Sequence, residues 1–214
     1  MLSRQSRIPA REVAPDGGQG RVKTLAPFVS AWGKLQRCAP EAWPHAYLPL
    51  SHHSADVAAV TAALLDLRLV REQLVRLGGN EFSRDHAAVL VGAAFLHDVG
   101  KANLGFWRKQ RPSPLRADGP VAGHVREAAP LLFAPAVRVM GLLPDAGGSF
   151  LKPDSPAGGL LIAALGHHGE PLACPELEEC ATRHARLWEP AEGYEPLAEA
   201  RALCTALATW LPES

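Results

Sequence analysis

The sequence predicts an all-α fold, a compact bundle of helices around one core. Apolar residues recur three or four positions apart over several long stretches, which is the spacing of a buried helix face. No stretch alternates apolar and polar residues convincingly enough to indicate a strand, and no internal repeat is present. The 214 residues, 47% hydrophobic and 21% charged, suit one globular domain with a sizeable core.

The first part of the chain divides into an arm, a short helix and a loop. Residues 1–26 contain Pro, Gly, Gln and scattered Arg without an apolar period, so we expect a flexible basic arm before one domain over residues 27–214. An ordinary flexible terminus, or a start codon assigned too early, would look the same. Apolar spacing then predicts a short helix over residues 28–35, and prolines predict a loop over residues 40–49.

Two long helices follow. The first is capped by either Ser51 or Ser54 and is expected to end at Gly78-Gly79. The second begins at Ser83 and runs to about Val99. It is apolar on all sides, as a helix at the centre of a bundle must be. Its last turn therefore contains the dipeptide His97-Asp98.

The rest of the chain is predicted to form shorter helices joined by loops. A Gly/Pro-rich composition predicts a loop at residues 145–159. The sequence Gly-His-His-Gly follows the buried helix that comes next. We expect helices at residues 123–132, 159–165, 175–188 and 195–210, and a further segment at residues 137–143.

The charge of the chain is divided unevenly. The net charge is zero, which argues against a wholly basic nucleic-acid binder. Residues 1–124 nevertheless carry 16 Lys and Arg against 10 Asp and Glu, whereas residues 125–214 carry 6 against 12. The basic half favours a polyanionic partner only slightly, because blocks of charge are usually solvated faces.

Cysteine content and the length of apolar runs indicate an intracellular protein. Four cysteines without an export signal are better interpreted as reduced thiols than as disulfides. The longest apolar run is about half of the roughly 20 residues that cross a bilayer, so we expect no membrane segment and a cytoplasmic location. Cys174, Cys180 and His184 make a poor zinc site, because their spacing is unsuitable and a fourth ligand is missing.

Histidines and one aspartate recur at predicted helix ends or beside glycine. Taken singly, each has an ordinary interpretation as a helix start, a capping neighbour or a turn residue. Together they predict a metal site, because helical bundles build such sites from side chains on several helices. Mixed imidazole and carboxylate ligands favour one or two divalent transition-metal ions, Mn, Fe, Co, Ni or Zn, over Mg or Ca. The six residues are His53, His97, Asp98, His124, His167 and His168.

These motifs also resemble a known family. Their order, His, His-Asp, His and His-His, is similar to that of the HD superfamily of metal-dependent phosphohydrolases. The stretches LSHHSADVAAV (50–60), FLHDVGKANLGF (95–106) and LGHHG (165–169) resemble the HD nuclease domain of the nuclease-helicase that degrades DNA in type I CRISPR interference. The resemblance covers roughly residues 45–170.

The resemblance implies that these six residues are the metal ligands and that Asp98 bridges two ions. His53 is preferred to His52, because only His53 keeps the family's three-residue interval to an Asp, here Asp56. Asp56 would orient a ligand or serve the structure. The family has a further Asp in a late helix, for which residues 195–214 offer no convincing match. The resemblance then implies either a domain truncated at its C-terminus or one piece of a protein whose helicase lies elsewhere. No phosphate-binding loop of a helicase motor is present in this sequence.

The function implied is a metal-dependent nuclease that cleaves phosphodiester bonds of single-stranded DNA in CRISPR interference, an antiviral defence. Its partners would be a helicase domain or subunit and the CRISPR RNA-guided surveillance complex. Asp98 would act in catalysis, and Lys101 would neutralise phosphate charge unless it only satisfies the dipole of its helix. The alternatives are an HD phosphohydrolase acting on small nucleotides and an inactive, metal-poor binding module.

The basic loop after the His-Asp pair is the predicted DNA path. A single strand needs an aromatic ring to stack on its bases and cations to neutralise its phosphates. A buried Trp beside a solvated basic loop would have the same sequence. The candidate residues are Trp107, Arg108, Lys109 and Arg111, with Arg116 beyond them.

Overall fold

The computed structural model describes residues 30–79, 81–112, 119–134, 150–169, 171–208 and 210. Helices dominate this part of the chain, and the sheet within it has two short strands, so the predicted all-α class is confirmed. Among the described helices, none is both long and apolar enough to cross a membrane. The predicted arm at residues 1–26, the segment at residues 137–143 and Arg116 lie outside the described residues.

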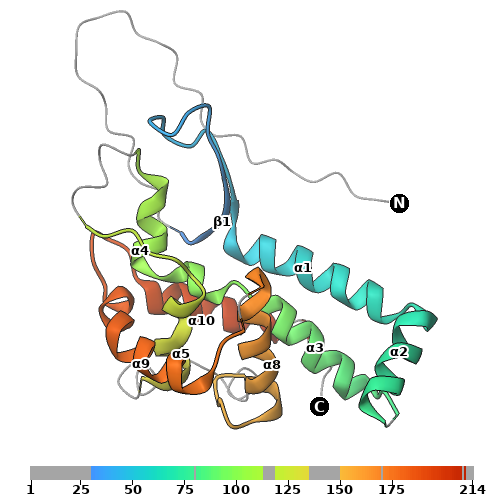
Figure 1. Ribbon diagram of the computed structural model, residues 1–214. Coiled ribbons are helices and arrows are strands. Elements are labelled where there is room, and N and C mark those ends of the chain that lie inside the picture. Colours follow the sequence, from blue (N-terminus) through green and yellow to red (C-terminus); the bar gives the residue numbers. More distant parts are fainter. Residues whose placement is uncertain are drawn as a thin grey trace, which may run out of the picture.

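A β-hairpin opens the described chain (Figure 1). It consists of β1 (Trp32–Gln36) and β2 (Ala46–Pro49), which pair antiparallel. The short helix predicted over residues 28–35 is therefore wrong, as is the expectation of no strand. The register shifts just after Trp32, so that β1 bulges at Gly33. A bulge interrupts the period-two alternation, and a strand of this length then carries no recognisable pattern.

The long helix predicted between residues 51 and 79 is two helices, α1 (Leu50–Leu65) and α2 (Arg68–Gly78). The chain leaves helical geometry at Leu67, where φ is −71° and ψ is 124°. The apolar period continues through this break, but Leu64 and Leu67 are exposed, so burial does not enforce one continuous helix. The end of α2 is as predicted, at Gly79, which has a left-handed φ of 69°.

The central helix is α3 (Arg84–Leu96), which packs against α1, α8 (Pro156–Leu165) and α10 (Pro196–Leu207). Ser83 caps it, as predicted, in a reciprocal capping box with the third residue of the helix. The helix ends a few residues earlier than predicted, because the chain passes into a 3-10 turn. His97 closes α3 and Asp98 precedes that turn.

The remaining elements are short and complete the bundle around α3. The helix predicted from residue 123 begins only at residue 129, because Pro130 fits the first turn of a helix and not its interior. His124 therefore lies in irregular chain rather than on a helix. The remaining elements are η1 (Val99–Ala102), α4 (Leu104–Trp107), η2 (Arg108–Gln110), η4 (Arg126–Ala128), α5 (Ala129–Phe133), η5 (Gly166–His168), α9 (Cys174–His184) and η6 (Ala185–Trp188).

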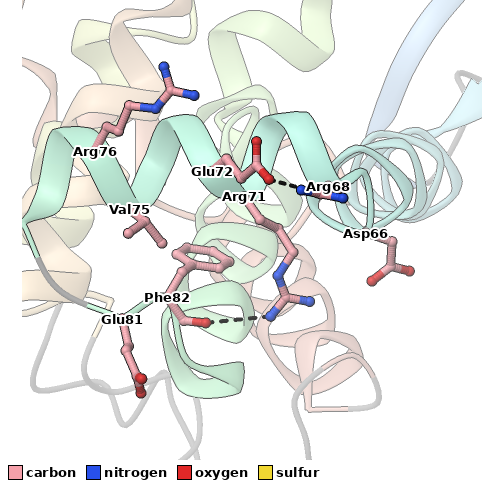
Figure 2. A pocket seen from close by; sticks show the side chains of 8 residues that line it. All are labelled: Asp66, Arg68, Arg71, Glu72, Val75, Arg76, Glu81 and Phe82. Carbon is pink, nitrogen blue, oxygen red and sulfur yellow. Dashed lines mark hydrogen bonds and ion pairs between the residues drawn. The ribbon is translucent and has the colours of Figure 1, made fainter.

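A pocket lies between α2 and the segment that precedes α3 (Figure 2). Helix α2 lies at one edge of the molecule (Figure 1). Arg71 packs on the Phe82 ring, 5.7 Å from its centroid, and donates a hydrogen bond to the Phe82 carbonyl. The pocket is separated from His97 by the length of α3, about 20 Å for a helix of this size, so it is no part of the site described below. The other lining residues are Asp66, Arg68, Glu72, Val75, Arg76 and Glu81.

Candidate metal centre

Asp98 lies at the centre of the histidine cluster and is 1% exposed. Its Oδ2 atom is 2.9 Å from His53 Nε2 and 3.1 Å from His97 Nε2. His53 belongs to the first turn of α1, and His97 closes α3. We call His53, His97 and Asp98 Oδ2 the inner group. Their ligand atoms all lie within 4.8 Å of one another, which is close enough to hold one metal ion.

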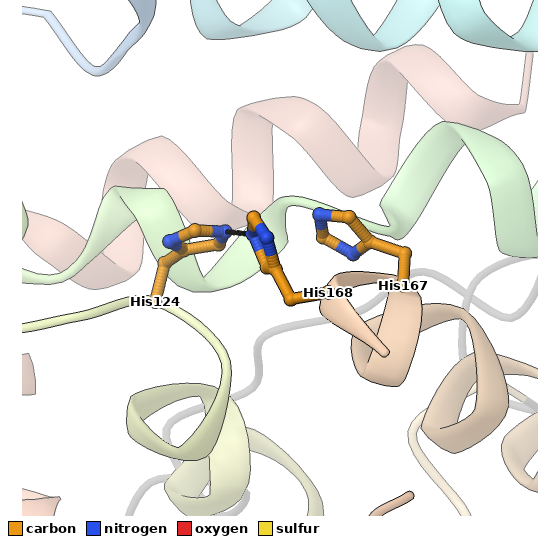
Figure 3. Close-up of side chains that lie close together, drawn as sticks. All are labelled: His124, His167 and His168. Atoms are coloured by element: carbon orange, nitrogen blue, oxygen red, sulfur yellow. Dashed lines mark hydrogen bonds between the residues drawn. The ribbon is translucent and has the colours of Figure 1, made fainter. Parts of the chain in front are cut away.

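A second set of imidazoles, which we call the outer group, consists of His124, His167 and His168. Asp98 Oδ1 lies 3.1 Å from His124 Nε2 and 3.8 Å from His167 Nε2. His168 Nε2 lies 3.1 Å from His124 Nε2 (Figure 3). These three rings also could hold a metal ion. The two oxygens of one carboxylate therefore face two separate sets of histidines.

Helix ends determine how two of the rings are oriented. The Nδ1 atoms of His97 and His167 each bond to the carbonyl three residues earlier, Ala94 at 2.7 Å and Ala164 at 2.9 Å. Because a carbonyl only accepts, Nδ1 carries the hydrogen, and Nε2 of the neutral ring carries a lone pair. Both Nε2 atoms thus direct a lone pair towards Asp98. A metal cation or a proton between two facing acceptors removes their repulsion, and a ring fixed through its other nitrogen is typical of metal-ligating histidine.

Burial and neighbouring charges set the protonation states. Burial lowers the pKa of His53, and the nearby Lys101 lowers it further. Burial also lowers the pKa of His167. For Asp98, burial raises the pKa, but contacts of the carboxylate with His124 and with the Lys101 ammonium outweigh this and hold the pKa well below its ordinary value. Neutral imidazoles and an ionised carboxylate are the forms that bind metal.

The donor set fits a divalent transition-metal ion. Among the described residues, Asp98 Oδ1 is one of two buried side-chain polar atoms without a hydrogen-bond partner. His124 Nε2 lies 3.1 Å away as a charge partner, without the alignment of a hydrogen bond. An orphaned anionic oxygen beside imidazole nitrogens suits a cation. The mixture of nitrogen and oxygen donors suits Mn, Fe, Co, Ni or Zn better than Mg or Ca.

Lys101 and the bulge of β1 form a wall of the inner group. Lys101 Nζ is 2.7 Å from Asp98 Oδ2 and donates to the Gly33 carbonyl at 3.1 Å. Lys101 thus contacts the carboxylate itself, rather than only the carbonyls of a helix end. Gly33 packs directly on His53, because a Cβ added at Gly33 would lie 2.5 Å from His53 Cβ. Sequence reasoning missed Gly33, and the one available signal was a glycine beside an aromatic residue, which is weak without a predicted strand.

The neighbours of His53 on α1 point elsewhere. His52 is exposed, so the structure brings His53, and not His52, to Asp98. Asp56, which the resemblance suggested as an orienting or structural residue, is also exposed.

The late acidic residues do not complete the cluster within the described chain. On α10, Glu199 Oε2 accepts a hydrogen bond from the Ala31 N–H at 3.1 Å, so this carboxylate ties α10 to the start of the hairpin. Of the residues that the structure describes, none on α10 belongs to either group.

The predicted DNA path is tied into the fold. The Trp107 ring is 1% exposed and stacks on Tyr194, with centroids 4.7 Å apart, so it offers no face to a base. The burial of Trp107 agrees with the alternative interpretation, but the basic residues beside it are half-buried rather than solvated. Arg108 pairs with Glu192 at 2.7 Å, and Arg111 pairs with the same carboxylate. Lys109 Nζ lies 4.6 Å from the Phe106 ring centroid.

Comparison with known proteins identifies one family. The family model described as "Cas3, HD domain" matches residues 32–214, a range that contains all six candidate ligands. The searches of curated proteins and of solved structures found no match.

Proposed function

The chain belongs to the Cas3 HD domain family, whose members are CRISPR-associated HD nucleases, and we propose that it cleaves phosphodiester bonds of single-stranded DNA in CRISPR interference, using bound metal. The observation that carries this proposal is the position of Asp98. A single buried carboxylate directs one oxygen to the inner group and the other to the outer group.

The ligands are divided between the two oxygens. His53, His97 and Asp98 Oδ2 would hold one divalent ion, and the outer histidines with Asp98 Oδ1 would hold a second. When bound, such ions activate water as a nucleophile and stabilise negative charge on phosphate oxygens. Asp98 remains ionised because of its neighbours, and His97 and His167 keep their orientation because Nδ1 is bonded to backbone.

Lys101 would assist at the phosphate. An ammonium has three donors, and within the described residues two of them are directed to Asp98 Oδ2 and the Gly33 carbonyl. The third can reach an anionic oxygen beside the inner group. Lys101 would therefore help to neutralise charge that develops on the phosphate, while keeping Asp98 ionised.

Family membership supports the proposed substrate and partners. Single-stranded DNA, a helicase domain or subunit, and the CRISPR RNA-guided surveillance complex would be partners of this chain. Of the loop residues, Lys109 is the best candidate for a DNA contact: it is partly exposed and lies on Phe106, whose ring is 5.3 Å from that of His124. Arg108 and Arg111 would first have to give up part of their pairing with Glu192.

The test is a cleavage assay with defined metal content. The full chain is stripped of metal, loaded separately with Mn, Fe, Co, Ni or Zn, and incubated with labelled single-stranded DNA, duplex DNA and a panel of nucleotides. We expect metal-dependent cleavage of the single strand, absent in Asp98→Ala. Cleavage of nucleotides but not of DNA would instead identify a small-nucleotide phosphohydrolase. Less than one equivalent of bound metal with no activity would identify a binding module.

A further inference from the structure

Asn103 is a buried amide between the two segments that carry Asp98 and His124. It is 0% exposed, and it uses both ends of its side chain. Nδ2 donates to the Gly100 carbonyl at 2.7 Å and to the Gly123 carbonyl at 2.8 Å. Oδ1 accepts from the Phe106 N–H at 2.8 Å, which caps α4. Both amide hydrogens and the carbonyl oxygen are therefore satisfied inside the protein.

The two carbonyls that Asn103 joins belong to different parts of the candidate metal centre. Gly100 lies in η1, two residues after Asp98, and Gly123 directly precedes His124. At this point the segments touch: a Cβ added at Gly100 would lie 1.8 Å from the His124 carbonyl oxygen. One amide thus fixes the distance between the turn that presents Asp98 and the chain that presents His124.

His124 depends on this link more than the other candidate ligands do. The others belong to the first turn of α1, the end of α3 or the turn that closes α8, where helical hydrogen bonds hold the backbone. His124 lies in irregular chain before η4. Besides Asn103, its segment is held by the Gly123 N–H, which donates to Glu127 Oε1 at 2.9 Å, and by the ring contact with Phe106.

We propose that Asn103 is a positioning residue for the metal centre: it sets the place of His124 relative to Asp98 Oδ1 and so determines how tightly the outer group holds its ion. This inference rests on the proposed function, because it assumes that the outer group binds metal. It adds a residue that touches neither metal nor substrate. Its action is separable from the cap of α4, because the cap uses Oδ1 whereas the link to His124 uses Nδ2.

Asn103→Ser separates the two roles. Serine is about as good an N-cap as asparagine, but it lacks the amide that reaches the Gly123 carbonyl. We expect the variant to bind the outer ion roughly 10- to 100-fold more weakly, the range found when a residue that orients a metal ligand is lost, with the inner ion unchanged. The measurement is a Co²⁺ titration of metal-stripped full chain, followed by visible absorption. His168→Ala serves as the reference for loss of outer binding.

Two controls account for folding. Ser83→Ala removes a comparable cap at the far end of α3 and should leave both cobalt affinities unchanged. Asn103→Asp keeps the size and the capping oxygen but not the donors, and it should reproduce the weaker outer binding if Asn103→Ser proves too unstable. If both Asn103 variants lose their helical circular dichroism, the residue serves the whole fold and the inference is overturned.

The outcomes distinguish the failure of this inference from the failure of the proposed function on which it rests. If the unaltered chain binds no cobalt, the proposed metal-dependent function fails. If it binds two ions and Asn103→Ser binds both as tightly, the proposed function stands and the role of Asn103 is refuted. An equal loss of affinity for both ions would also refute the role of Asn103, because its hydrogen bond to the Gly123 carbonyl acts on the outer group alone, through His124.

Discussion

The inner and outer groups use the same chemistry on different supports. The inner histidine side chains are each 12% exposed, and they lie in the first turn of α1 and at the end of α3, braced by Gly33 and Lys101. In the outer group, the His167 side chain is 32% exposed, His168 is exposed, and His124 lies in irregular chain. Side chains on regular elements are held more rigidly than those on loops. We therefore expect the inner group to bind metal more tightly and the outer group to be the side that substrate reaches.

The comparison is sharpest at Asp98, which both groups share. Asp98→Ala should lose both ions and reduce nuclease activity to background, because it removes the carboxylate that faces both sets of histidines. Metal analysis of the purified variant and cleavage of single-stranded DNA are the measurements. Circular dichroism should show unchanged helical content, and His97→Ala, which removes a ligand of the inner group alone, should lose about one equivalent of metal and most of the activity. Retained activity in both variants would refute the site.

The next largest effect is a difference in metal affinity between the variants His53→Ala and His168→Ala. Each should lose about one equivalent of metal and most of the activity, but the ion that remains in His168→Ala should be the tighter one, since it occupies the more rigid inner group. Equilibrium dialysis against Mn²⁺ measures both the number and the affinity of the ions. Identical behaviour of the two variants would mean that the two groups are not distinct.

A smaller effect is expected for Gly33→Ala. The added Cβ would meet His53 Cβ at 2.5 Å, so either His53 or the bulge of β1 must shift. We expect His53 to be displaced and the inner ion to bind roughly 10- to 100-fold more weakly. Gly159→Ala on α8 is the matched control, because a Cβ there meets nothing within 4 Å. That substitution should raise the free energy of unfolding by about 0.4–1 kcal/mol. Unchanged metal affinity in Gly33→Ala would show that the bulge is only structural.

The pH dependence of stability tests the protonation states without metal. The pKa values of His53 and His167 are lowered by burial from 6.5, so below pH 6.5 the unfolded chain binds more protons than the folded one. The free energy of unfolding should then decrease as pH falls from 6.5 towards the lowered pKa values. Urea unfolding of metal-stripped protein between pH 7.5 and 5.5 measures this decrease. It should be smaller in His53→Ala, and a stability that rises on acidification would contradict the assignment.

The smallest effect is expected for His52→Ala. Its side chain is exposed, so the free energy of unfolding should change by no more than about 0.5 kcal/mol, and metal content should be unchanged. A loss of metal as large as that of His53→Ala would show that the wrong neighbour was assigned to the inner group.

Several features were predictable because they depend on local sequence. The apolar spacing predicted the central helix and the helices at α8 and α10, Ser83 marked the start of the central helix, and Gly79 marked the end of α2. Residue type and order were enough to select six candidate ligands, all of which the structure brings together. The break at Leu67 was missed because an apolar period does not reveal whether its residues are buried, and Leu64 and Leu67 are exposed. The hairpin was missed because a bulged strand has no alternating pattern.

The sequence by itself determined the helical class, the family and the identity of the clustered histidines, because these depend on side-chain type and spacing. The tertiary structure alone decided which oxygen of Asp98 faces which histidines, that Trp107 stacks on Tyr194 rather than on a base, and that Gly33 and Asn103 support the site. These features arise from contacts between distant residues, such as the 45 positions between His53 and Asp98 and the 68 between Gly33 and Lys101. Local patterns hold no information about such pairs until the chain is folded.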